Sequence, residues 1–166
     1  NKYARHELAD PKKVPLLESI DEDCLNQFVG ALSEIAKDQE ACIEQPLRTE
    51  IFVQISDFLT SLGDHLDSVV EGTNAVTAFF QCLRNSFSTS VCCNTLYCLN
   101  IVLDGSKSAR KKTILGNIIV IEDGVEVEKT NLHILIKMLR GPSILPYACE
   151  SLKILIEKEP DLIPYM

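Results

Sequence analysis

An internal repeat constrains the fold of this chain more than any other feature. Residues 74–99 (NAVTAFFQCLRNSFSTSVCCNTLYCL) align without a gap on residues 130–155 (TNLHILIKMLRGPSILPYACESLKIL), a shift of 56 positions. Apolar residues coincide along both halves of the alignment, and the break between the halves falls at the same place. A partial third copy aligns residues 32–46 with 152–166. A unit that recurs in this way favours a stack of similar elements, each covering its neighbour's apolar face.

The apolar spacing inside the repeat is helical. Val76, Phe79, Phe80 and Leu83 follow one another at steps of three and four residues, which places them on one face of a helix. The same spacing recurs at residues 25–35, 132–139 and 152–156, with glycines and prolines between the stretches. We therefore predict an all-α domain over residues 23–166, preceded by a partly ordered extension over residues 1–22.

The end of the chain carries a more specific pattern. A leucine-rich helix and a short break are followed by A-x-x-x-L-x-x-L at Ala148, Leu152 and Leu155, and then by a polar turn. This succession resembles an armadillo-type repeat, with weaker copies around residues 28–35 and 92–99, and HEAT repeats are the close structural alternative. Residues 47–62 would supply the helix that precedes the second unit. The resemblance implies an armadillo-like α-α superhelix of about three repeats.

One segment departs from the armadillo pattern. Residues 106–129 are longer than an armadillo connector and contain IIVIEDGVEVE, in which β-branched residues flank Asp123 and Gly124. An Asp-Gly pair between such runs is typical of a β-hairpin. A short β-hairpin insertion near 117–127 and a first helix followed by a long loop are equally supported by the sequence.

Composition narrows the classes of partner. The chain carries 16 basic and 24 acidic residues, a net charge of −8, which argues against nucleic acid and against an anionic membrane surface as the main ligand. It contains no uninterrupted apolar run long enough to span a membrane. Its seven cysteines lie mostly within apolar helical stretches, which favours buried thiols in a reducing compartment. We expect an intracellular protein, cytoplasmic or nuclear.

Groupings that carry catalysis are missing from the sequence. The three histidines are scattered, and phosphate-binding loops, zinc-protease motifs and nucleophile elbows do not occur. Cys93 and Cys98 are five residues apart, a spacing that does not match the paired ligands of structural zinc sites. We predict that the chain is not an enzyme and that it binds no cofactor or metal.

The armadillo resemblance also implies where a partner would bind. In that family, tryptophan and asparagine side chains of the third helices line a concave groove and hold an extended peptide. Neither residue type occupies the corresponding positions here: the tryptophan position falls on Gly30, Asn94 and Glu150, and the asparagine position on Glu34, Cys98 and Ile154. We therefore expect a groove that contacts a partner helix, with Glu34, Asn94, Cys98, Glu150 and Ile154 as candidate contact residues.

A basic cluster provides the alternative site. Lys111 and Lys112, with Lys107 and Arg110, form the one concentration of positive charge in the sequence, beside Ser106 and Ser108. One interpretation is a site for an acidic partner, tuned by phosphorylation. The other is a solvated helix end, where cations stabilise the C-terminus of the helix that finishes near Leu103.

Together these features predict a scaffold or adaptor domain that binds another protein through the concave face of stacked helices. The alternative is a regulatory domain that acts on a small GTPase or a chaperone, as some armadillo-like proteins do.

Overall fold

The computed structural model describes residues 23, 27–28, 30–31, 34, 45–85 and 88–166. The predicted extension over residues 1–22 and most of the predicted first repeat lie outside the described residues. The described part is mostly helical, as the sequence predicted, and includes one small antiparallel sheet. Its elements are α3 (Gln45–Leu62), η1 (Gly63–His65), α4 (Leu66–Glu71), α5 (Ala75–Asn85), α6 (Thr89–Gly105), α7 (Lys107–Leu115), β1 (Asn117–Glu122), β2 (Val125–Thr130), α8 (Asn131–Lys137), α9 (Leu145–Lys158) and η2 (Pro160–Tyr165).

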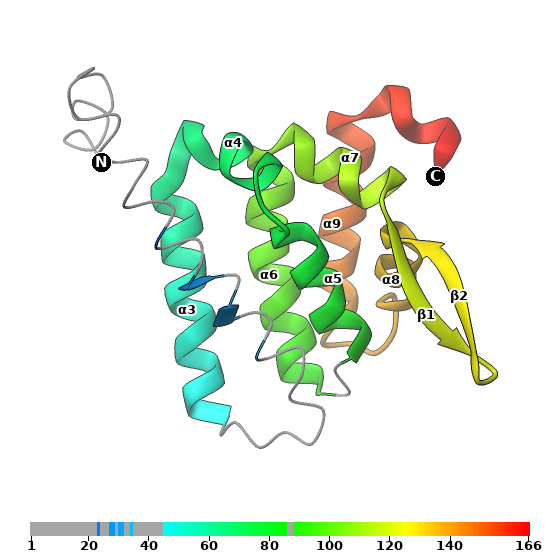
Figure 1. The fold of residues 1–166 in the computed structure, drawn as a ribbon, viewed down its shortest axis with the longest axis horizontal. Coiled ribbons are helices and arrows are strands. Elements are labelled where there is room, and N and C mark those ends of the chain that lie inside the picture. The colour runs from blue at the N-terminus through cyan, green and yellow to red at the C-terminus, as the bar shows by residue number, and fades with distance from the viewer. Residues whose placement is uncertain (1–22, 24–26, 29, 32–33, 35–44, 86–87) are drawn as a thin grey trace.

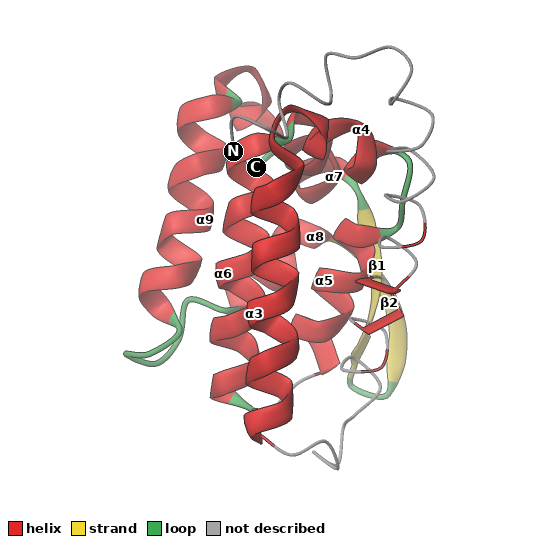
Figure 2. Ribbon diagram, turned by 90° about the vertical axis from the view of Figure 1, so that its left-hand side faces the viewer, coloured by secondary structure: helices red, strands yellow, loops and turns green. Residues whose placement is uncertain are grey.

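The helices form two layers. Helices α3, α6 and α9 lie side by side, with α6 in the middle and in extensive contact with both neighbours (Figure 1, Figure 2). Helix α5 packs against α6 from the other layer, which also contains α8 and the hairpin. Helices α5 and α8 begin 56 positions apart, at Ala75 and Asn131, and so do α6 and α9, at Thr89 and Leu145. The helix starts therefore follow the shift seen in the sequence.

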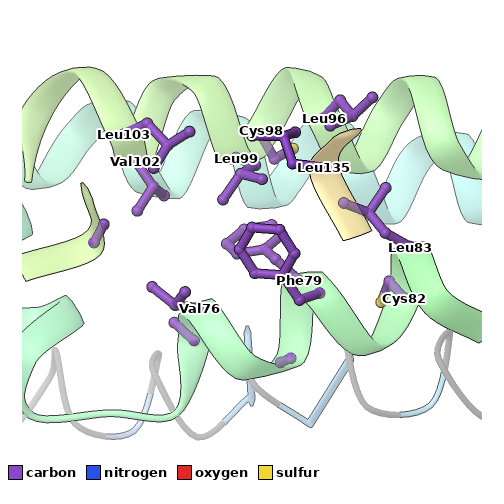
Figure 3. Close-up of a cluster of buried hydrophobic side chains, with 14 of the residues drawn as sticks. Val76, Phe79, Cys82, Leu83, Leu96, Cys98, Leu99, Val102, Leu103 and Leu135 are labelled. Atoms are coloured by element: carbon purple, nitrogen blue, oxygen red, sulfur yellow. The ribbon is translucent and has the colours of Figure 1, made fainter. Parts of the chain in front are cut away.

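The hydrophobic core lies between the two layers. Side chains of α5, including Phe79 and Leu83, point toward Leu99 and Leu103 of α6, with Leu135 of α8 beside them (Figure 3). All five side chains are at most 1% exposed. Because Phe79 and Leu135 are equivalent positions of the sequence repeat, the repeated apolar stripe is what joins α5 and α8 to a common core.

The sequence left two interpretations for the segment near residues 117–127, and in the structure this segment forms a β-hairpin. Strands β1 and β2 pair in an antiparallel register that begins at Asn117–Thr130 and ends at Glu122–Val125. Asp123 (φ 52°) and Gly124 (φ 79°) form the two-residue turn, and both adopt the left-handed conformation that such a turn requires and that aspartate and glycine tolerate best. Alternation in β1 buries Ile118 and Val120 and leaves the intervening side chains exposed. The strands extend to 130, three residues beyond the predicted range.

Candidate functional site

The concave-face site predicted from the armadillo resemblance is wrong in two of its residues. Cys98 is fully buried and faces α3, where its Sγ lies 3.7 Å from the carbonyl oxygen of Phe52. Ile154 is 7% exposed and belongs to the core. The expectation that both face solvent fails because each of these helices is covered on more sides than the repeat alignment indicated. The apolar surface that suggested a partner helix is therefore part of the interior.

The remaining residues of that site are placed as follows. Asn94 of α6 is half-buried and Glu150 of α9 is exposed, on the two neighbouring helices that the sequence predicted. Glu34 is exposed and helical, and most of the repeat to which the sequence assigned it lies outside the described residues. Phe28 packs on the rings of Phe58 and Phe79, with centroids 5.8 Å apart in both pairs. Helix α3 lies beside α6.

The predicted basic cluster divides into an exposed part and a structural part. Lys111 is exposed. Lys112 Nζ donates to the backbone carbonyl oxygens of Val70, Glu71 and Thr73 at 3.0, 3.3 and 3.5 Å, and so covers the C-terminal end of α4. A cation at that position satisfies carbonyl groups that have no partner within their helix. The sequence assigned Lys112 to partner binding, whereas in the structure its side chain is engaged inside the domain.

Ser106, beside this cluster, has a structural role as well. Ser106 is fully buried, and its Oγ accepts a hydrogen bond from Ala109 N–H at the start of α7. Asp67 accepts from Ser106 Oγ at 2.7 Å and from Ser108 N–H at 2.9 Å. These hydrogen bonds, from the Ser108 backbone first, lower the pKa of Asp67 below its ordinary value of 3.8. The phosphorylation interpretation does not fit Ser106, because a kinase cannot reach a fully buried hydroxyl.

Arg110 confirms the helix-end interpretation. Its Nη1 donates to the carbonyl oxygens of Leu103 and Asp104, at 2.9 and 3.3 Å, in the last turn of α6. Its Nε donates to Glu159 Oε1 at 2.9 Å, and both side chains are nearly buried. The guanidinium therefore joins the ends of α6 and α9 to α7.

Residues of α5, α8 and the hairpin line a groove that the sequence did not predict. These elements lie on the opposite side of α6 from α3 (Figure 1). The groove opens between the C-terminal ends of α5 and α8 and strand β1, and it has a volume of about 580 Å³. We call it the hairpin groove. Its lining includes Leu83, Arg84, Ile121, Lys137, Met138 and Arg140. Leu83 and Met138 are buried and form part of an apolar floor, whereas the three cationic side chains stand at the rim.

One wall of the hairpin groove is an unpaired strand edge. Asn131 N–H donates to Gly116 C=O at 2.8 Å, one residue beyond the Asn117–Thr130 pair at the open end of the hairpin. Because bonded and non-bonded pairs alternate in an antiparallel ladder, the even-numbered residues of β1 bond to β2. Ile119 and Ile121 therefore direct their N–H and C=O groups away from β2. Within the described residues, Ile121 has no backbone partner on this edge.

Arg84 already contacts this edge. Its Nη1 donates to the carbonyl oxygen of Ile119, and its Nε donates to the side chain of its neighbour Asn85 at 3.0 Å. A side-chain donor thus occupies the position that the N–H of a further strand would take. The bond also confirms that the Ile119 carbonyl points out of the hairpin.

The groove is positively charged although the chain as a whole is acidic. Arg84, Lys137 and Arg140 line it, against one carboxylate, Glu126. Lys137 Nζ lies 3.8 Å from Glu122 Oε1, so part of its charge is balanced. No ion pair involves Arg84 or Arg140 in the described part of the chain. Arg84 and Arg140 are equivalent positions of the 56-residue repeat, and this equivalence was the one signal in the sequence that could have pointed to the groove.

Two of the buried cysteines in the described segments, Cys82 and Cys98, are poor nucleophiles. Cys82, Cys92 and Cys98 are buried, Cys93 is half-buried and Cys149 is exposed, and all five carry reduced thiols. Burial raises the pKa of Cys82 and of Cys98 to about 12, because a thiolate is poorly solvated there. Among the residues that the structure places, no three histidine, cysteine or acidic side chains lie together as metal ligands. In the same residues, no helix combines the length and apolar character needed to cross a membrane.

Comparison with known proteins adds no further assignment, since no family model, curated protein or solved structure matches the chain.

Proposed function

We propose that this domain is a protein-interaction module and that it binds a segment of a partner protein in the hairpin groove. One observation carries the proposal: the groove combines an apolar floor, a cationic rim and a free strand edge in one place. Sites for peptides and small molecules are typically concave and apolar, with a few polar groups that fix orientation. The helices behind the groove hold this arrangement on a packed core.

The proposed architecture is an armadillo-like stack that supports this site. Helices α5 and α6 would form one unit and α8 and α9 the next, with α3 as the helix that precedes the first of these units. The equal shift of 56 positions between both pairs of helix starts supports this assignment. In this view the hairpin is inserted between the two units, and the groove is formed where the insertion meets the ends of α5 and α8.

The module would act inside the cell. Five reduced cysteines within the described residues, three of them buried, support a reducing compartment, because oxidising compartments favour disulfides.

The test is a selection of linear peptides from a displayed random library, followed by binding measurements on two matched variants. Lys137→Trp places an indole ring at the rim of the groove, and Lys153→Trp makes the same change at an exposed position of α9 that does not line it. We expect selected peptides to bind the wild type and the Lys153 variant alike, and to bind the Lys137 variant at least about tenfold more weakly. Peptides that bind all three proteins equally would place the site elsewhere and refute the proposal.

A further inference from the structure

We propose that the segment held in the hairpin groove is extended and acidic, and that it adds to the free edge of β1 as a third strand. This inference rests on the proposed function and specifies the chemistry of the partner. Three independent observations carry it: the direction of the β1 edge, the contact made by Arg84, and the charge of the rim.

The edge of β1 supplies the backbone recognition. Ile121 presents an N–H and a C=O away from β2, and Ile119 presents the same groups two residues earlier. A strand added there would lie about 4.8 Å from β1 and would meet these groups at alternate residues. β1 is six residues long, so a partner segment of similar length, about 20 Å when extended, can pair along it.

Arg84 occupies the position on the edge of β1 where an added strand would pair. Its guanidinium donates to the Ile119 carbonyl oxygen from the groove side, as the N–H of an added strand would. An incoming strand would take over this carbonyl and release the guanidinium. The released cation would then need a new partner beside the strand, and a carboxylate of the bound segment would provide it with a fork-shaped pair of hydrogen bonds.

The positive charge at the rim favours a partner segment of negative charge. Three cationic side chains stand around the groove against Glu126, in a chain whose net charge is −8. Like charges held face to face repel, so a second copy of this chain is disfavoured as the occupant. In a symmetric pair joined edge to edge through β1, Arg84, Lys137 and Arg140 of one copy would approach the same residues of the other. An acidic segment of another protein meets no such repulsion.

The test uses the peptides selected on the wild-type protein. We expect them to be enriched in aspartate and glutamate and in β-branched residues at alternate positions. N-methylation removes a backbone donor, so a scan along the best peptide should weaken binding at least about tenfold at alternate residues and have little effect between them. Neutralising its acidic residues should weaken binding and flatten its dependence on salt.

Two pairs of protein variants locate the same interaction on the domain. Ile121→Pro removes the outward N–H of β1, and Glu128→Pro removes an outward N–H from the opposite edge of the hairpin; proline is tolerated at such positions because the ladder does not use them. Of these two variants, only Ile121→Pro should weaken peptide binding, by at least about tenfold. Arg140→Glu should weaken binding in the same way, and Lys153→Glu, an exposed change outside the groove, should not.

The outcomes separate this inference from the proposed function. Sensitivity to Lys137→Trp shows that a peptide binds in the groove. If such peptides tolerate N-methylation at every residue, or carry no acidic residues, the acidic-strand inference alone is overturned. If no peptide is enriched, both fail. A dimer that forms with rising concentration and is lost in Ile121→Pro would replace the acidic partner by a second copy of the chain. Because the N-methyl scan uses the wild-type protein, an unstable proline variant does not decide the result.

Discussion

The buried ion pair between Arg110 and Glu159 gives a sharp test of how the ends of the helices are held. Glu159→Ala removes the carboxylate and leaves the guanidinium nearly buried, with side-chain exposures of 12% and 9% in the intact pair. Breaking such a pair from one side costs about 3–5 kcal/mol. Arg110 keeps its two carbonyl acceptors in α6, so we expect the lower end, about 3 kcal/mol. Glu159→Gln keeps an acceptor and should cost about 1 kcal/mol.

Urea denaturation followed by circular dichroism measures these losses as shifts of the midpoint at constant slope. Glu157→Ala, which removes an exposed carboxylate in the last turn of α9, is the matched control and should change stability by less than about 0.5 kcal/mol. Combining Arg110→Met with Glu159→Ala should cost at least about 1 kcal/mol less than the sum of the single changes. If Glu159→Ala is no more destabilising than Glu157→Ala, the pair does not hold the end of α9 and this reasoning fails.

Three further predictions concern the core, the turn before α7 and the thiols. Ile154→Asp should destabilise the fold by more than about 3 kcal/mol, because it buries an unpaired charge; a native-like denaturation midpoint would show that Ile154 faces solvent. The pKa of Asp67 is lowered in the folded state, so its contribution to stability is present above pH 3.8 and is lost as the pH falls below it. Asp67→Asn should therefore reduce the acid sensitivity of the midpoint, and an unchanged pH profile would contradict the assignment. In native protein at pH 8, iodoacetamide should label Cys149 long before Cys82 or Cys98, as followed for each site by mass spectrometry; equal rates would show that the two buried thiols are accessible.

The sequence predicted those features that depend on local pattern. The helix starts follow the 56-residue shift, because the apolar stripes and the breaks between them recur together. The hairpin was one of two interpretations that the sequence supported equally, and Asp123 and Gly124 account for it, since two successive left-handed residues suit a two-residue turn. Leu99 and Leu155, equivalent in the repeat, are both fully buried.

Features that depend on tertiary contact could not be predicted in the same way. Cys98 was assigned to a surface because the alignment shows which positions match, but not how many neighbours surround each helix. Its residue type was the better guide, since cysteine and isoleucine are among the residues most often buried. The hairpin groove was missed because its walls come from three segments that are far apart in the sequence. Only the matching positions of Arg84 and Arg140 hinted at it.

Residue-specific amide hydrogen exchange, measured by NMR with and without the tightest selected peptide, tests the central claim most directly. In the free protein, the N–H groups of Ile121 and Glu128 both point away from the ladder, on opposite edges of the hairpin, and should exchange quickly. A strand added to β1 should slow exchange at Ile121 at least about tenfold and leave Glu128 fast. If Ile121 still exchanges as fast as Glu128 when the peptide is bound, the partner does not pair with the free edge of β1.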